Sequence, residues 1–317
     1  MADVAELQEK FAIPGVLAFE PTASGLVVAR VTTTAAEAAV YLQGAHVTHW
    51  KPAGQAPAIF LSQRAEFAPG KPIRGGVPVI FPWFGERQEG KPGPAHGFAR
   101  ISEWELAFAA MAGDELHLTF TLAPNELSHS LGFDHFKLSY RVTVGRALTL
   151  ELTVANDSGS GGAHESSPEA NAIGAALVFE EALHTYYAVA DARKVAIDGL
   201  GATTYIDKVD ESKRKIQPAG AFKFEGRTDR PYLNTETTCV LSDQAGGRRI
   251  VVAKTGSRST VVWNPWEELT AKMSDMEPDA WLHMTCIETA NVGEDAVTLK
   301  AGETHSMRAH ISIEKMA

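Results

Sequence analysis

The chain has 317 residues, of which 44% are hydrophobic and 21% are charged. A chain of this length and composition can bury a large core, which excludes disorder, collagen and coiled coil as descriptions of the whole protein. The 29 basic and 39 acidic residues give a net charge of −10, which disfavours a general nucleic-acid binder or a protein of anionic membrane surfaces. Two cysteines, Cys239 and Cys286, are too few for a disulfide scaffold or a cysteine-rich metal site.

The N-terminus shows no signal for export. It is acidic and lacks a basic segment followed by an apolar one, so no signal peptide is expected. The longest apolar stretches, such as Val77 to Phe84, are too short and too interrupted by proline to span a bilayer. We therefore expect a cytoplasmic protein without a membrane partner.

The first predicted element is a short helix over about residues 3–12. Val4, Leu7 and Phe11 form one apolar stripe at helical spacing. Pro14 and Gly15 are expected to end the helix.

After this helix the hydrophobic pattern alternates with a period of two, which predicts half-buried antiparallel strands. The alternation is clearest in residues 115–122, 135–144 and 147–154, and Gly145-Arg146 predicts a tight hairpin between the last two. Shorter strands are predicted at residues 26–31, 236–241, 249–254, 260–263, 284–288 and 305–313. Many short strands without a long helical pattern favour one large sandwich or barrel.

Residues 156–172, NDSGSGGAHESSPEANA, have a different composition from the rest of the chain. Small and polar residues dominate, and the segment has no apolar period. We interpret it as a flexible loop inserted between two strands. A domain linker is less favoured, because strand patterns of the same kind continue on both sides. Residues 1–317 are thus expected to form a single domain.

The sequence contains no Walker loop, no dinucleotide-binding glycine motif, no His-Glu-x-x-His and no Gly-x-Ser-x-Gly. Three other windows are dense in unusual residues. The first, residues 71–100, has Arg74 and Arg100 near its ends, with His96 and many glycines, prolines and aromatics between them. Guanidinium groups suit phosphate, and aromatic rings can support a sugar. A proline-rich loop with solvated charges is an equally good interpretation.

The second window, residues 179–187, places His184 among aromatic residues after two carboxylates. Taken alone, it is better interpreted as a core histidine bonded to the backbone. In the third window, residues 261–291, Glu288 follows an apolar run. A buried carboxylate is costly unless it is paired or catalytic. Taken alone, this glutamate is better interpreted as a strand end facing solvent.

The chain resembles the glucose-6-phosphate 1-epimerases, which are hexose-6-phosphate mutarotases of the aldose 1-epimerase superfamily. The resemblance covers about residues 25–313 and is carried by these segments, in this order: FLSQRAEFAPGKPIRGGVPVIFPWFG, AHGFARISEWEL, FEEALHTYYAV, TDRPYLNT, VVWNPWEE and MTCIETANV. It implies an all-β fold, one large antiparallel β-sandwich of the galactose mutarotase type, with the site in a cleft on its concave face. It also implies interconversion of the α and β anomers of glucose 6-phosphate and related hexose 6-phosphates.

The resemblance implies two catalytic residues. His184, in the HTY motif, would be the general acid, and Glu288, in the IE motif, the general base. Histidine suits the acid role because its unperturbed pKa is about 6.5. Ring opening moves only protons, so no cofactor and no metal is implied.

Four substrate ligands are implied in the same way. Arg74, in the RGG motif, and Arg100, in the HG-x-AR motif, would bind substrate, with the phosphate as the expected target. Asp229, in the DR-x-Y motif, would hold sugar hydroxyls, and His96 would line the sugar site. The family often has glutamine where this chain has Ala95, so that contact is expected to be missing or supplied elsewhere. The partner expected is a small hexose 6-phosphate, bound by a monomer without nucleic acid.

Three other functions are possible. A carbohydrate sensor of this fold needs no acid–base pair, and this chain keeps both His184 and Glu288. An epimerase of free aldoses needs no phosphate ligands, and Arg74 and Arg100 argue against it. A glycoside hydrolase or lyase is the third, but glycosidases generally use paired carboxylates, whereas the best pair here is histidine and glutamate.

Overall fold

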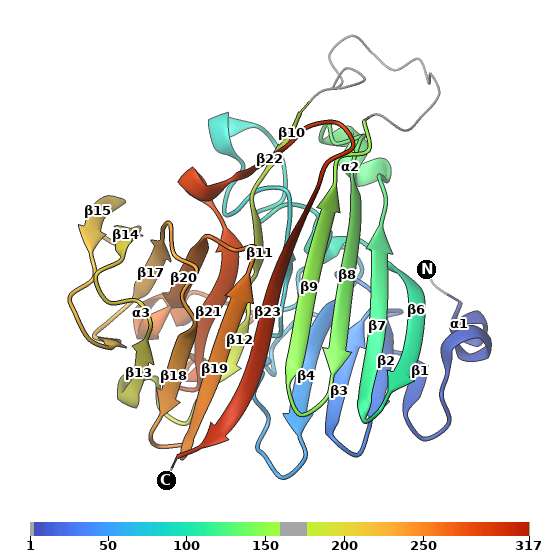
Figure 1. The fold of residues 1–317 in the computed structure, drawn as a ribbon, viewed down its shortest axis with the longest axis horizontal. Helices are drawn as coiled ribbons and strands as arrows, with labels where there is room; N and C mark the ends of the chain where they lie inside the picture. The colour runs from blue at the N-terminus through green and yellow to red at the C-terminus, as the bar shows by residue number, and fades with distance from the viewer. Residues whose placement is uncertain (1–2, 159–175, 317) are drawn as a thin grey trace.

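The structure is a computed structural model of the chain and describes residues 3–158 and 176–316. Within these ranges the strands stack in two antiparallel layers (Figure 1). The predicted all-β antiparallel sandwich is therefore confirmed. Apart from residues 156–158, the loop predicted at residues 156–172 lies outside the described residues.

One layer is a nine-stranded sheet of the described residues, in the order β16-β13-β18-β19-β23-β9-β8-β7-β6. It forms the front of the molecule in Figure 1. The strands of this sheet are β6 (Glu105–Ala112), β7 (Glu115–Leu122), β8 (Lys137–Val144), β9 (Leu148–Ala155), β13 (Val195–Asp198), β16 (Phe222–Lys223), β18 (Cys239–Asp243), β19 (Arg248–Thr255) and β23 (Thr304–Lys315).

The other layer lies behind it in Figure 1 and contains two sheets. The first has the order β1-β2-β3-β4, with β1 (Leu17–Pro21), β2 (Val27–Thr32), β3 (Ala36–Tyr41) and β4 (His46–Pro52). The second has the order β15-β14-β17-β20-β21-β11-β5, and β12 also pairs with β21. Its strands are β5 (Val79–Ile80), β11 (Glu181–Leu183), β12 (Tyr186–Ala188), β14 (Thr204–Asp207), β15 (Lys213–Ile216), β17 (Thr228–Tyr232), β20 (Ser259–Asn264) and β21 (Met284–Asn291). A separate pair is formed by β10 (Leu177–Phe179) and β22 (Val297–Leu299).

The helices of the described residues are short. The first, α1 (Val4–Phe11), lies within the range predicted from its apolar stripe, and the side chain of Asp3 caps it by accepting from the Ala5 N–H. The others are α2 (Glu126–Ser130), α3 (Trp266–Thr270) and the 3₁₀ turns η1 (Gln88–Gly90), η2 (Ala99–Ile101), η3 (Ala192–Lys194), η4 (Ala280–Leu282) and η5 (Gly293–Asp295). No helix in the described ranges is long and apolar enough to cross a membrane.

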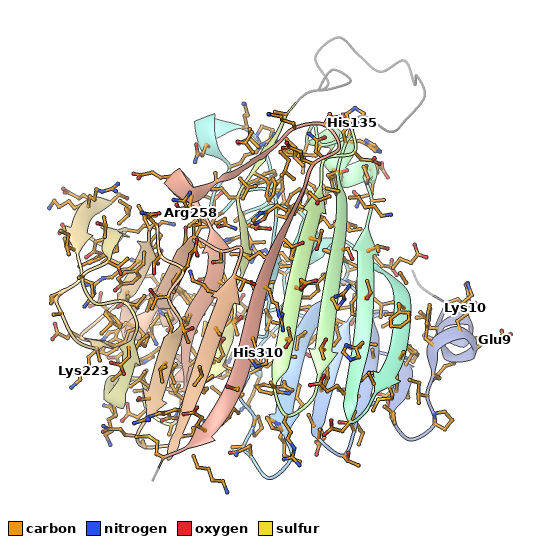
Figure 2. The ribbon with its side chains drawn as sticks, viewed as in Figure 1. Glu9, Lys10, His135, Lys223, Arg258 and His310 are labelled. Carbon is orange, nitrogen blue, oxygen red and sulfur yellow. The ribbon has the colours of Figure 1, made fainter. Side chains whose placement is uncertain are left out.

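The period-two pattern decides which side chains fill the space between the layers. In β7, every second residue is buried, and β9 shows the same alternation. Gly145 donates its N–H to the carbonyl of Ala147, which closes the hairpin predicted between β8 and β9. In β23, Met307 and Ile311 are buried, whereas His310 lies on the outer face of the sheet (Figure 2). Alternation therefore predicts both the strands and their buried faces.

One hydrophobic cluster joins the two layers. It extends from Leu7 to Ile311 and includes Trp50 from β4 of one layer and Leu150 from β9 of the other. This continuity supports a single domain, which stays a prediction.

Strand β21 is the element on which the site depends. All eight of its residues are buried, because β20 pairs with it on one side and β11 and β12 pair with it on the other. The sequence pattern ended this strand at Glu288, but the ladder continues to Asn291. The interpretation of Glu288 as a strand end facing solvent is therefore wrong: its carboxylate lies inside the sheet, 1% exposed.

Candidate active site

His184 lies opposite Glu288 at a break between two strands. Strand β11 pairs Leu183 with Thr289, and β12 pairs Tyr186 with Cys286, so both follow one register along β21. The same register places His184 directly across from Glu288. On its other side the His184 N–H donates to the carbonyl of Pro78 at 3.0 Å, which continues the register of β11 on β5.

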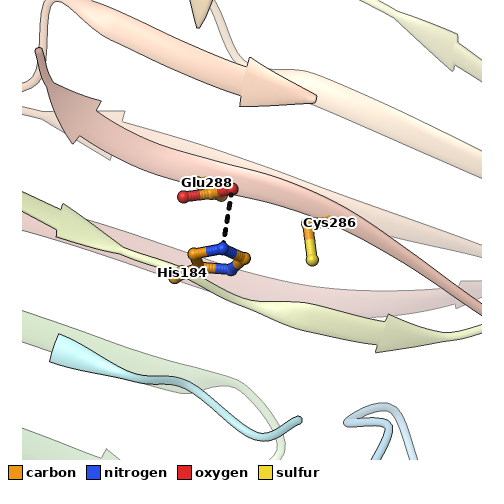
Figure 3. Close-up of side chains that lie close together, drawn as sticks. All are labelled: His184, Cys286 and Glu288. Atoms are coloured by element: carbon orange, nitrogen blue, oxygen red, sulfur yellow. Dashed lines mark ion pairs between the residues drawn. The ribbon is translucent and has the colours of Figure 1, made fainter. Parts of the chain in front are cut away.

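The two side chains contact each other in a buried environment. Nε2 of His184 lies 3.4 Å from Oε1 of Glu288 (Figure 3), and the side chains are 9% and 1% exposed. Neither carboxylate oxygen of Glu288 has a hydrogen-bond partner among the described residues, and neither does Nδ1 of His184. Buried polar groups in proteins are normally hydrogen-bonded, so these atoms are available to a ligand.

Burial shifts both groups toward their neutral forms. It lowers the pKa of His184 well below 6.5, and a positive charge on His96, Arg100 or Arg74 acts in the same direction. Burial and the carboxylate of Asp229 raise the pKa of Glu288 well above its ordinary value. The expectation of an imidazolium at its unperturbed pKa therefore does not hold for the free protein. Both shifts favour the state in which the imidazole is neutral and the carboxyl group carries the proton of the pair.

Aromatic rings fix the orientation of the imidazole. Tyr186 stacks on His184 with ring centroids 4.9 Å apart and planes at 13°. Trp263 meets the imidazole edge-on at 6.0 Å, and Phe84 lies parallel to it at 6.5 Å. The imidazole is therefore held by packing, with Nε2 directed toward Glu288.

Arg74 connects the same cluster to a second carboxylate. Its Nε donates to Asp275 at 2.9 Å and its Nη1 donates to the hydroxyl of Tyr186 at 3.1 Å. The two glycines that follow it have positive φ, and a Cβ at Gly76 would lie 2.3 Å from Nε2 of His46. The RGG motif thus brings the backbone close to β4. This close approach fixes the position from which the Arg74 side chain extends.

Arg100 is the second cation of the site. Its Nη2 donates to the carbonyl of Ala95 at 2.7 Å, while its buried Nε has no hydrogen-bond partner among the described residues. Burial, with a further contribution from Arg74, lowers the pKa of Arg100 to about 10. Position 95 thus contributes through its backbone, by orienting this arginine. Two guanidinium groups that influence each other, one with a free donor, form a positively charged region suited to an anion.

His96 lies near the end of the first window, residues 71–100, at a turn with a strained backbone. Its φ is 63°, and Nδ1 accepts from the Gly85 N–H at 3.2 Å, which leaves Nε2 as a donor of the neutral ring. Burial and the charge of Arg100 lower the pKa of His96 to about 3. At Gly97 a Cβ would lie 2.0 Å from the carbonyl of Phe81, so only glycine fits there. The His-Gly pair therefore makes a turn that no larger second residue could make.

Asp229 approaches the pair from β17. It is paired with Trp263 in the ladder, and burial raises its pKa. Lys208 lies 4.0 Å from its carboxylate and 4.7 Å above the ring of Phe84. Lys208 and Phe84 also line a pocket of about 290 Å³ beside the site. All six residues predicted for the site therefore lie in one connected cluster.

The sequence analysis missed several members of this cluster. Tyr186 and Trp263 stood inside the highlighted windows, and their aromatic character was the available signal. Asp275 lay in the third window without a distinguishing neighbour. Lys208 had no signal, because it lies outside every window and reaches the site only through the pairing of distant strands.

Cys286 adds a third ligand-bearing atom beside the acid–base pair. One ligand atom from each of His184, Cys286 and Glu288 can be chosen so that all three lie within 4.8 Å of one another. Among the described residues this is the group with the spacing of a metal site.

The sequence profile of the Aldose 1-epimerase family matches residues 28–312. The chain belongs to the aldose 1-epimerase family.

Similar proteins agree with this assignment. The chain is 37% identical, over 85% of its length and 84% of the relative's, to a protein of Escherichia coli K12 named "putative glucose-6-phosphate 1-epimerase". It is 31% identical to a protein of Cenchrus ciliaris with the same name, over 87% of this chain and 80% of that protein. A crystal structure described as a "putative mutarotase" from Salmonella typhimurium superposes with a TM-score of 0.83 at 31% identity, over 96% of both chains.

Proposed function

We propose that this protein interconverts the α and β anomers of hexose 6-phosphates, with glucose 6-phosphate as the first candidate. The observation that carries the proposal is the buried pair of His184 and Glu288, 3.4 Å apart, beside the two guanidinium groups of Arg74 and Arg100. The pair supplies acid–base chemistry at C1, and the arginines supply a site for the phosphate. A monomer acting in the cytoplasm, without nucleic acid or membrane, is part of the same proposal.

The reaction begins when the substrate redistributes the proton of the pair. Sugar hydroxyls donating to Glu288 would stabilise its carboxylate, and the proton would pass to Nε2 of His184. The carboxylate then takes the proton of the C1 hydroxyl, the C1–O5 bond breaks with its electrons going to O5, and His184 protonates O5. The product is the open aldehyde with the pair in its other protonation state.

The second half of the reaction reverses these steps on the other face of C1. The aldehyde rotates about C1–C2, and His184 takes the O5 proton as O5 attacks C1. Glu288 returns a proton to the new C1 hydroxyl. Proton transfers by positioned groups of this kind typically contribute about 10²–10⁴-fold to the rate.

The sugar and phosphate contacts position the ring. The Nε2–H of His96 and the carboxylate of Asp229 would bind hydroxyls of the sugar. The phosphate does not react, so its contacts with Arg74 and Arg100 are uniform binding that lowers KM and holds C1 in place.

The test is anomer exchange measured by NMR on glucose 6-phosphate, free glucose and free galactose under identical conditions. We expect acceleration on the phosphorylated sugar well above that on either free sugar. Equal acceleration on all three sugars would favour an epimerase of free aldoses. Binding of glucose 6-phosphate without any acceleration would favour a sensor.

The pH dependence of kcat/KM follows from the two pKa shifts of the free protein, because kcat/KM reports the groups of the free enzyme. A second proton enters the free pair through His184, whose pKa is lowered, and the last proton leaves through Glu288, whose pKa is raised. The contribution of the pair to kcat/KM is therefore expected to stay constant as pH falls through about 6.5, the ordinary value for histidine. The rate should be measured well below KM, with the uncatalysed rate subtracted and with a correction for the substrate phosphate, which itself titrates near about pH 6. An acid limb of the corrected kcat/KM centred near about pH 6.5 would show that His184 titrates as an ordinary histidine.

A further inference from the structure

Cys286 has no part in the proposed reaction, yet it lies beside both reacting groups. It is two residues before Glu288 on β21, and successive side chains of a strand alternate between faces, so the thiol and the carboxylate share one face. His184 faces them from the break between β11 and β12. Figure 3 shows the three side chains converging on one small space.

Several ligand atoms in this space have no hydrogen-bond partner within the described part of the chain. Both oxygens of Glu288 and Nδ1 of His184 are buried without a hydrogen bond among the described residues. The sulfur of Cys286 completes the group, since one ligand atom of each of the three residues lies within 4.8 Å of the other two. A bound divalent cation would give these buried atoms the partners that residues 3–158 and 176–316 do not supply.

We propose that His184, Cys286 and Glu288 form a binding site for a thiophilic divalent cation, with Zn²⁺ as the best match. Imidazole nitrogen, thiolate sulfur and carboxylate oxygen are the three ligand types that zinc uses in proteins, and three protein ligands leave a fourth position open. Bond lengths of about 2.0–2.3 Å place neighbouring ligand atoms roughly 3.5 Å apart in a tetrahedron. The present separations, all within 4.8 Å, need only a small inward movement of side chains.

The cationic surroundings limit the affinity of the site. The charges of Arg74 and Arg100 act on His184, and Lys208 acts on Glu288. Ligation also requires the thiol to lose its proton, so binding should strengthen as pH rises. We therefore expect a reversible site that a chelator empties.

Occupation of this site would stop anomer exchange, a consequence that rests on the proposed function. The cation would take a lone pair of Glu288 and a nitrogen of His184, the groups that move protons to and from the sugar. Zinc is thus expected to inhibit, and EDTA to restore, the activity of the same sample. A thiol in this position makes the enzyme sensitive to the supply of soft metal ions.

Direct binding is the primary test, on untagged full-length protein without sugar. Co²⁺ should give a near-ultraviolet thiolate-to-cobalt band at one equivalent per chain, and calorimetry should show one Zn²⁺ per chain. Cys286→Ala should lose the band and weaken Zn²⁺ binding by at least about tenfold, since even the loss of an outer-shell partner typically costs about 10–100-fold. Cys239→Ala, which removes the other buried cysteine, should behave as wild type. The Cys286→Ser variant repeats the test in case the alanine variant folds poorly.

Three results would overturn the proposal. They are the absence of a thiolate band in wild type, Zn²⁺ binding that is as tight in folded Cys286 variants as in wild type, and a Cys239→Ala variant that loses the band. Inhibition is measured separately. The loss of anomer exchange with added Zn²⁺ is compared between wild type and Cys286→Ala, at protein concentrations that give equal rates without Zn²⁺. If neither the wild type nor Cys286→Ala accelerates anomer exchange, the proposed function fails. The binding data still decide the metal site in that case.

Discussion

Glu288→Gln and His184→Ala are each expected to reduce anomer exchange by about 10²–10⁴-fold while the sandwich stays folded. The glutamine is nearly isosteric, so it keeps the packing of β21 but removes the group that accepts and returns the C1 proton. The alanine removes the group that protonates O5 and leaves the aromatic stack incomplete. The measurement is saturation-transfer NMR on glucose 6-phosphate, with circular dichroism melts to confirm folding.

A second buried glutamate–histidine pair provides a matched control. Oε1 of Glu181 lies 3.0 Å from Nε2 of His305 and accepts from Asn291 at 2.8 Å, and its carboxylate is fully buried. Oε1 of Glu181 has two partners, whereas Oε2 has none among the described residues. Because His305 and Asn291 already hold this carboxylate, Glu181→Gln is expected to lower stability but to keep kcat near the wild-type value. Near-normal turnover in folded Glu288→Gln would show that Glu288 does not transfer the C1 proton.

Replacing Arg74 or Arg100 with alanine should raise KM for glucose 6-phosphate by one to a few orders of magnitude. A hydrogen bond to a charged group contributes roughly 1.5–3 kcal/mol, and each 1.4 kcal/mol is about a factor of ten. The effect on kcat should be smaller, because the phosphate is remote from C1, although lost positioning can lower it. Lysine should restore only part of the affinity, since it lacks the planar fork.

Free glucose separates phosphate recognition from damage to the site. It has no phosphate to lose, so activity on glucose should barely change in either variant, and inorganic phosphate should compete less well than in wild type. Arg74→Ala also frees Asp275 and the hydroxyl of Tyr186, so Arg74→Ala with Asp275→Asn tests whether the unpaired carboxylate adds to the loss. Equal losses on the two sugars, or none on either, would refute the phosphate role.

The fold was predictable because its strands are amphipathic. In β7 and β9 alternate side chains enter the core, and this local rule needs no knowledge of distant partners. The rule fails for β21, which is buried on both faces and so shows no alternation. For this reason the strand was predicted three residues too short, and Glu288 was open to interpretation as exposed.

The site was predictable only in part, through the resemblance to a family. The motifs gave His184 and Glu288 as a pair, and the structure places them across one register of a sheet. Lys208 and Asp275 reach the cluster through long-range pairing, which leaves no local mark in the sequence. The pKa values were also beyond prediction, because they depend on burial and on charges brought together by folding.

The strand break at His184 has a consequence for which part of the complex moves. In the proposed mechanism, His184 and Glu288 sit on backbone held by central strands, so neither can follow C1 as the aldehyde turns over. The conformational change would then belong to the sugar, which would pivot at one end while its phosphate end is held. On this view the protein works as a rigid frame with two fixed proton positions, and the ligand is the moving part.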